Sequence, residues 1–116
     1  MPLATRYVFM VTMDVAPGKE ALFNEVYDTE HVPNLMQVPG VRAVTRLRTE
    51  PARFVIGGQP RDLTGEGQPT YLAIYEIDSP AVLESAAWAE ASEKGRWPSD
   101  VRPFTSNRHH IVRAVI

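Results

Sequence analysis

The residues best suited to acid–base chemistry gather in one short stretch, residues 27–33. His31 is the leading candidate because an imidazole, with an unperturbed pKa of about 6.5, exchanges protons near neutral pH. Tyr27 lies one helical turn earlier, where it could orient His31 or donate to a substrate oxygen. Glu30 is adjacent and is a candidate substrate contact. We therefore predict His31 and Tyr27 as catalytic residues. The alternative is that His31 caps the last carbonyls of a helix and Tyr27 packs in the core.

Two other side chains are candidate substrate contacts. Arg46 shares a strand face with Arg42 and Arg48, and a guanidinium binds carboxylate or enolate oxygens. A solvated face with ion pairs is the alternative for these arginines. Trp97 could close a pocket as an aromatic lid or anchor its loop on the core. Trp88 fits a core or a subunit interface.

The remaining histidines, His109 and His110, are adjacent on a predicted strand and therefore point to opposite faces. The mixed set of His109, Ile111 and Arg113 favours His109 as the histidine that faces a cavity. A solvent-exposed or interface histidine is the alternative.

Composition excludes several kinds of site and partner. The 116 residues contain no cysteine, which excludes disulfides and thiolate chemistry and fits a reducing cytoplasm. Only three histidines are present and two diverge, so we expect no metal site and no cofactor. A net charge of -2 does not favour nucleic acid. The apolar run at residues 7–13 is too short to cross a bilayer, so no membrane partner is expected.

The hydrophobic pattern and the positions of proline and glycine predict the strands and helices that must position these side chains. Residues 6–15 have strand composition with both faces apolar. A helix begins near residue 17 or 19, and Pro33 predicts its end near His31. Residues 41–49 form a second strand, and residues 50–69, rich in glycine, form a long loop.

The second half of the chain also has the order strand, helix, strand. Residues 70–77 form a strand, and Ser79 with Pro80 starts a helix over residues 80–94. Residues 96–105 form a loop, and residues 106–116 form the last strand. This βαββαβ order predicts one ferredoxin-like α+β domain over residues 1–116. Two helices cover only one sheet face, so the doubly apolar first strand predicts a homodimer that packs sheet on sheet.

The stretch at residues 27–33, followed by Val38-Pro39-Gly40-Val41 and an arginine-bearing strand, resembles the EthD-like branch of the dimeric α+β barrel superfamily. The resemblance implies a ferredoxin-like subunit that dimerises into a barrel, with a small cavity in each subunit. Similar members include polyketide cyclases, dehydratases, decarboxylases, isomerases and monooxygenases that need no metal. Haem-degrading members use an Asn on the first strand, a Trp on the second helix and a nearby His. Trp88 matches loosely, but the first strand has no Asn.

The sequence leaves three alternatives open for the function. The first is a cofactor-independent enzyme that cyclises, dehydrates, decarboxylates or isomerises an oxygenated, aromatic or polyketide-like substrate by proton transfer. The second is a dimer that binds a small ligand without turning it over, as a binding or regulatory module. A purely structural dimer, with its cavity filled by its own side chains, is the third alternative.

Overall fold

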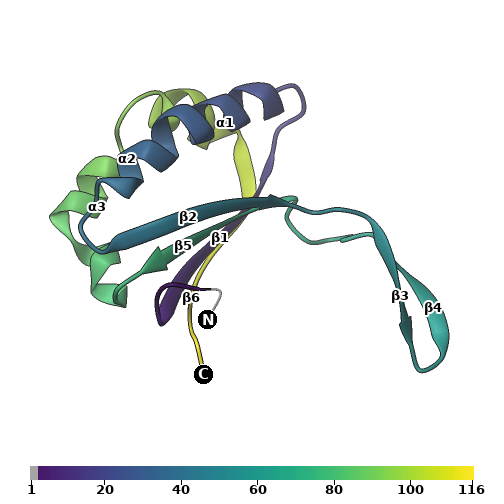
Figure 1. Ribbon diagram of the computed structural model, residues 1–116. Helices are drawn as coiled ribbons and strands as arrows, with labels where there is room; N and C mark the ends of the chain where they lie inside the picture. Colours follow the sequence, from purple (N-terminus) through teal and green to yellow (C-terminus); the bar gives the residue numbers. More distant parts are fainter. Residues whose placement is uncertain (1–2) are drawn as a thin grey trace.

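Four antiparallel strands form one sheet in the order β2-β5-β1-β6, and the helices lie on one of its faces (Figure 1). This computed structural model describes residues 3–116. The strands are β1 (Tyr7–Val15), β2 (Val41–Arg48), β5 (Tyr71–Ile77) and β6 (Thr105–Ala114). Strand order, strand direction and the helical layer are those of the ferredoxin-like fold, so the predicted α+β class is confirmed.

Strand register decides which side chains face the helices. Val11 of β1 lies opposite Ala73 of β5 and His110 of β6. Residues across an antiparallel ladder share a face. We call this the helix-side face. The alternate residues form the helix-free face, which includes Met10, Thr12, Ile74, His109 and Ile111.

The first helical segment is longer than predicted. It runs without interruption through α1 (Glu20–Val26), one turn of π-helix, η1 (Tyr27–His31), and α2 (Val32–Met36). The prediction that the helix ends near His31 is therefore wrong. Figure 1 shows this segment lying along the sheet as one rod.

The π-turn explains how the helix passes Pro33. In an α-helix, a proline removes one backbone donor and its ring clashes with the carbonyl four residues earlier. Here the Val32 N–H instead bonds the Tyr27 carbonyl, five residues back. The wider turn places Pro33 in the first turn of α2, where a missing N–H is tolerated.

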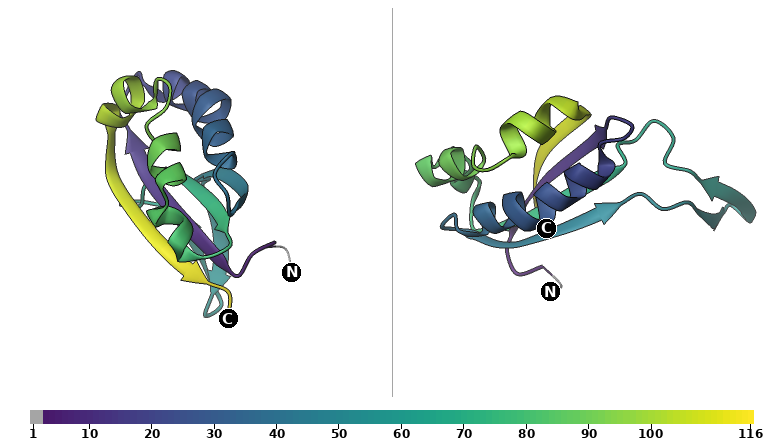
Figure 2. Two further views of the ribbon diagram at one scale, coloured as in Figure 1. Left: turned by 90° about the vertical axis from the view of Figure 1, so that its left-hand side faces the viewer. Right: turned by 90° about the horizontal axis from the view of Figure 1, so that it is seen from above.

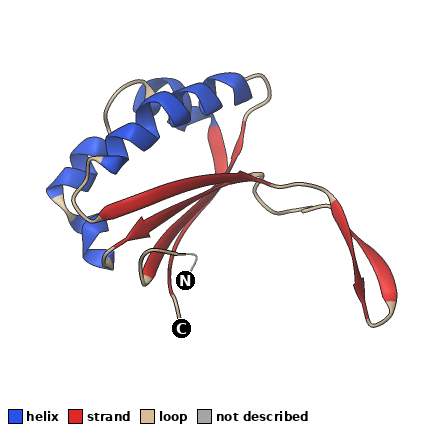
Figure 3. Ribbon diagram, viewed as in Figure 1, coloured by secondary structure: helices blue, strands red, loops and turns tan. Residues whose placement is uncertain are grey.

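Residues 50–69 are not the structureless loop that the sequence predicted. They contain a hairpin of β3 (Ala52–Ile56) and β4 (Gln59–Leu63). Gly57 and Gly58 both have positive φ, 57° and 78°, as a two-residue hairpin turn requires. Every residue of the two strands is exposed, and the hairpin projects away from the sheet and the helices (Figure 3).

The second helical region is interrupted rather than continuous over residues 80–94. It consists of a 3-10 segment, η2 (Pro80–Glu84), and a short helix, α3 (Ala86–Ala91). Ser79 caps η2 by accepting a hydrogen bond from the Ala81 N–H, as predicted. Ser85 is extended and caps α3 through the Trp88 N–H. A second capping serine therefore splits the predicted helix.

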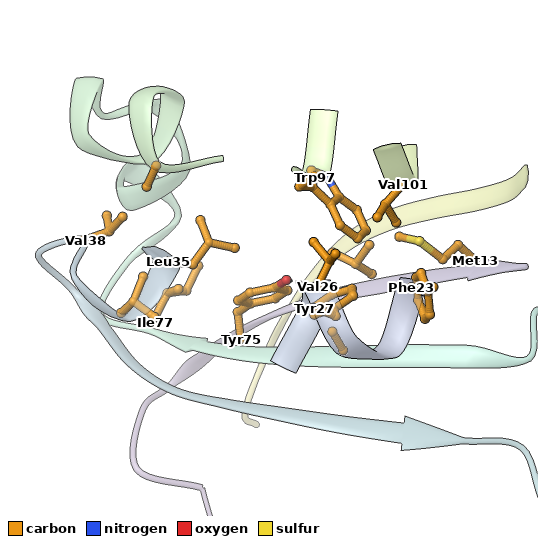
Figure 4. Packing of buried hydrophobic residues seen from close by; sticks show 14 of the residues in the cluster. Met13, Phe23, Val26, Tyr27, Leu35, Val38, Tyr75, Ile77, Trp97 and Val101 are labelled. Atoms are coloured by element: carbon orange, nitrogen blue, oxygen red, sulfur yellow. Dashed lines mark hydrogen bonds between the residues drawn. The ribbon is translucent and has the colours of Figure 1, made fainter. Parts of the chain in front are cut away.

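The predicted loop at residues 96–105 is helical. It contains η3 (Trp97–Val101) and η4 (Arg102–Phe104), which lie beside the long helical segment (Figure 2). Trp97 and Val101 of η3 pack into the core, above Tyr27 and Met13 in the view of Figure 4. Within residues 3–116, no helix is long and apolar enough to cross a membrane.

Candidate functional site

A cavity of about 220 Å³ lies between the helix-side face of the sheet and the helices. Strand β1 contributes Phe9, Val11 and Met13 to its wall. The long helical segment contributes three residues that lie one turn apart, because residues four apart share a helix face. These are Tyr27, His31 and Leu35. The predicted catalytic pair therefore lines one cavity.

His31 is held firmly in the cavity wall. It is 6% exposed, and the Trp97 ring stacks on its imidazole with 4.2 Å between ring centroids and 14° between ring planes. Its Nδ1 atom is enclosed and has no hydrogen-bond partner within residues 3–116. Trp97 is anchored in the core, one of its two predicted roles, and it also forms part of the cavity wall, while its role as a lid stays a prediction.

Burial makes His31 a neutral imidazole at pH 7. Burial, and to a smaller extent the nearby Arg102 cation, lower the pKa of His31 to about 4, while Glu93 opposes the shift. A position at a helix C-terminus would have favoured the protonated form. Because the helix continues to Met36, His31 does not occupy that position. It therefore presents one N–H donor and one lone pair.

Tyr27 does not orient His31 through its hydroxyl. The Tyr27 and Tyr75 hydroxyls lie 2.6 Å apart in a buried hydrogen bond. The Tyr27 ring instead packs edge-on against His31, with 5.2 Å between centroids. Burial raises the pKa of Tyr27 to about 12 and the pKa of Tyr75 well above its usual value, so both remain protonated. One hydroxyl hydrogen is used between them, and the second is available to the cavity that both residues line.

Arg46 lies outside the cavity, behind the Tyr27 ring. Its guanidinium sits 4.4 Å from the centre of that ring and bonds the side chains of Asp28 and Asn24, each at 2.7 Å. These contacts use two of its five N–H donors. Arg46 supports the helix against β2 and does not line this cavity, so its role as a substrate contact stays a prediction.

Glu30 also points away from the cavity. Its carboxylate accepts hydrogen bonds from the Arg96 backbone N–H at 2.9 Å and from Arg96 Nε at 2.5 Å. The backbone bond, followed by the side-chain bond, lowers the pKa of Glu30. Since Trp97 follows Arg96 directly, this pair fixes the start of η3. Glu30 is a positioning residue for Trp97 and does not line this cavity, and its role as a substrate contact stays a prediction.

Glu30→Gln is expected to loosen the stacking of Trp97 on His31, because a neutral amide replaces the charge-assisted bonds to Arg96. In a Trp88→Phe background, Trp97 is the sole tryptophan. Its emission should move to longer wavelength as the ring becomes more hydrated, with only a small loss of thermal stability. Glu66→Gln, an exposed glutamate beyond the hairpin, is the control and should leave the emission unchanged.

The histidine that faces the cavity is His110, and the prediction of His109 is wrong. His110 pairs with Val11 on the helix-side face and lines the cavity, whereas His109 lies opposite Thr12 on the helix-free face. The pKa of His110 is lowered by partial burial, then by Arg108 and His109. The mixed polarity of His109, Ile111 and Arg113 does not show which face of the sheet they occupy. A shift of the strand register by one residue would exchange the two faces.

Several cavity residues were not predicted. Tyr75 alternates with Ala73 and Ile77 on β5, a period-2 pattern that gives its face but not its partner. Trp88 was assigned to the core or an interface, yet it lines the cavity from α3. Arg102 and Arg108 come from the region before and at the start of β6. No local pattern marks these two arginines, since only the path of the chain brings them to the site.

No group of three or more His, Asp or Glu side chains is placed to hold a metal ion in the described part of the chain.

The comparisons with known proteins support the fold. No family model and no curated protein matches the sequence. Among solved structures, a variant of MhuD with two manganese protoporphyrin IX molecules bound per active site is 14% identical, with a TM-score of 0.64. That match covers 95% of this chain and 94% of the other. An ethyl tert-butyl ether D (EthD) family protein from Bacillus halodurans is 16% identical, with a TM-score of 0.59, over 95% and 99% of the two chains. The resemblance carried by residues 27–33 is thus confirmed at the level of fold: this chain has the ferredoxin-like α+β fold of EthD-like and dimeric α+β barrel proteins.

Proposed function

We propose that the protein is a cofactor-independent enzyme that moves a proton on a small oxygenated substrate held in the cavity. The observation that carries this proposal is the enclosed imidazole of His31 beside the Tyr27–Tyr75 hydroxyl pair, in one cavity. A base and a hydrogen-bond donor on one substrate are the requirements for removing a proton next to a carbonyl group.

His31 accepts the proton and the hydroxyl pair stabilises the charge that forms. In the free protein the low pKa of His31 keeps the imidazole neutral, which leaves its lone pair available. Loss of a proton from carbon gives an enolate, and this anion raises the pKa of the neighbouring imidazole as it forms. The free hydroxyl hydrogen of the tyrosine pair donates to the enolate oxygen. Cyclisation, dehydration, decarboxylation and isomerisation can all begin from such an intermediate.

The test follows proton exchange and does not require the natural reaction. Aromatic 1,3-diketones and β-keto esters are incubated with the protein in D2O, and loss of the α-proton signal is followed by NMR. We expect His31→Gln to slow the protein-catalysed exchange by roughly 100-fold or more, the usual contribution of a general base. His109→Gln, on the helix-free face, is the matched control and should keep the wild-type rate.

An exchange rate that survives His31→Gln unchanged would contradict the proposed role of His31. A second function, binding without turnover, is favoured by the same low pKa of His31, since a base of pKa about 4 is weak until an anion forms beside it. Compounds that raise the melting temperature, are recovered unchanged and show no exchange would establish that second function.

A metalloporphyrin, which the MhuD structure holds, does not fit this site. The cavity of about 220 Å³ lies below the roughly 300–1,000 Å³ of pockets for drug-sized ligands. At the first strand the wall consists of Phe9, Val11 and Met13, with no amide side chain. The site matches a compound about the size of one or two aromatic rings.

We also infer that two copies pack through the helix-free faces of their sheets. On this face Leu47 is 44% and Ile111 41% exposed, although both stand on sheet strands where apolar side chains are normally covered. Met10, Leu72 and Ile74 extend the same surface across the central strands. An identical surface on a second copy would bury these side chains around a two-fold axis.

Light scattering over a range of concentrations is expected to give twice the 13.0 kDa of one chain. Ile111→Glu should raise the dimer dissociation constant at least about tenfold, because it buries a carboxylate at the interface. Val112→Glu is the matched control, since Val112 is 39% exposed but pairs with Phe9 on the helix-side face. A monomer at all concentrations, or equal effects of the two substitutions, would rule out this interface.

A further inference from the structure

The charged side chains around the cavity are all of one sign. Arg102 and Arg108 border it together with two histidines, and no Asp or Glu side chain is among its lining residues in the described chain. Elsewhere the same protein pairs most of its arginines with carboxylates. The charge carried by the lining side chains themselves is therefore positive, which favours a negatively charged ligand.

The two arginines differ in how their charge is balanced. Arg102 Nη1 contacts both carboxylate oxygens of Glu93, at 3.0 and 2.9 Å, and Nη2 donates to the Ser92 carbonyl at 3.2 Å. Arg108 makes no ion pair within residues 3–116. It stands on β6, two residues before His110 and on the same face. Because β6 is an edge strand, Arg108 lies at the rim of the cavity with an uncompensated charge.

The inner wall is built for a flat apolar group. Trp88 packs edge-on against Phe9 and Tyr75, with ring centroids 5.7 and 5.5 Å away. The Phe9 ring also stacks near His110 at 6.0 Å, and Trp97 covers His31. Aromatic rings that present faces and edges to one space pack well against a further ring. A ligand that fits this cavity therefore has an aromatic ring at one end, against the inner wall, and an anionic group at the other, at the cationic rim.

We infer that the cavity takes a planar aromatic carboxylate, with its ring against Trp88 and Phe9 and its carboxylate paired with Arg108. This inference rests on the proposed function, since it names the substrate class of the same cavity. A guanidinium pairs with a carboxylate through two parallel hydrogen bonds, so the acid should bind much better than its neutral amide.

The test uses benzoate and 4-hydroxybenzoate against benzamide and 4-hydroxybenzamide. The two tryptophans of the chain both line the cavity, so quenching of their fluorescence reports binding at this site. We expect each acid to bind at least about tenfold more tightly than its amide, as one charge-assisted contact provides. Arg108→Gln should remove this preference without changing the melting temperature. Arg113→Gln, an exposed arginine on the other face of β6, is the control and should preserve it.

Equal affinities of acid and amide for the wild-type protein would overturn the inference, and so would equal losses in the Arg108→Gln and Arg113→Gln variants. If the preference is absent while His31-dependent proton exchange persists, the substrate class is wrong and the proposed function stands. If no aromatic probe of either charge changes the tryptophan fluorescence, the inference fails, and if His31-dependent proton exchange is absent as well, the proposed function fails with it.

Discussion

Lowering the pH from 6.5 to 4 is expected to remove about 3 kcal/mol from the free energy of unfolding through His31 alone. The folded state holds the pKa of His31 near 4, mainly through burial, whereas the unfolded chain restores it to about 6.5. Between these values the unfolded state binds more protons, so stability falls as the pH falls. The contribution of His31 is fully present above pH 6.5 and is lost on passing through pH 4.

Urea unfolding at a series of pH values, followed by tryptophan fluorescence, measures this loss. His31→Gln removes the titrating group and should flatten the dependence between pH 6.5 and 4. His110, whose pKa is also lowered, contributes in the same direction and leaves a smaller residual slope in that variant. A wild-type protein as stable at pH 4.5 as at pH 7 would show that His31 is not buried as the structure has it.

Gly40→Ala is expected to destabilise the protein by about 2–4 kcal/mol, the sum of backbone strain and overpacking. Gly40 has a φ of 94°, a conformation that L residues rarely adopt. A Cβ atom at this position would also lie 2.5 Å from Cγ2 of Val82, a buried side chain of η2. Gly40 lies in the turn that connects the long helical segment to β2. The Gly40 carbonyl accepts a hydrogen bond from the Asp78 N–H at 2.9 Å.

Gly18→Ala is the matched control for this prediction. Gly18 has a similar φ of 83°, but a Cβ atom there would meet nothing within 4 Å. Its substitution should cost only the backbone strain, about 1 kcal/mol. Thermal or urea unfolding of the two variants separates the two contributions. Equal destabilisation would mean that Val82 moves aside freely and that the close approach at Gly40 carries no energy.

The order of strands and helices was predictable because hydrophobic periodicity and capping residues act locally. Ser79 and Pro80 start a helix wherever the chain folds, and residues 6–15 form a strand as expected. The interruption at Ser85 and the hairpin at residues 52–63 were missed. At Ser85 two capping interactions compete within one helical pattern. In the hairpin, β3 (ARFVI) ends in an apolar run without period-2 alternation, and β4 (QPRDL) is mostly polar and contains a proline.

The candidate site was predictable in part. His31 and Tyr27 lie one turn apart on one helix, so their proximity follows from helix geometry alone. The contacts of Tyr75, His110 and Arg108 depend on strand register, which no local pattern fixes. No sequence pattern predicted the π-turn, which contains both Tyr27 and His31. Pro33, two residues after His31, indicated the end of a helix, and the structure has a widened helical turn there instead.

The projecting β3–β4 hairpin has a consequence for how this protein can change in length. None of its residues lines the cavity between the sheet and the helices, and its tip at Gly57-Gly58 stands in solvent. Related chains could therefore gain or lose residues at this tip without moving His31. The same tip is a suitable place to insert a peptide tag or a reporter domain, since an insertion there leaves both chain ends and the cavity as they are.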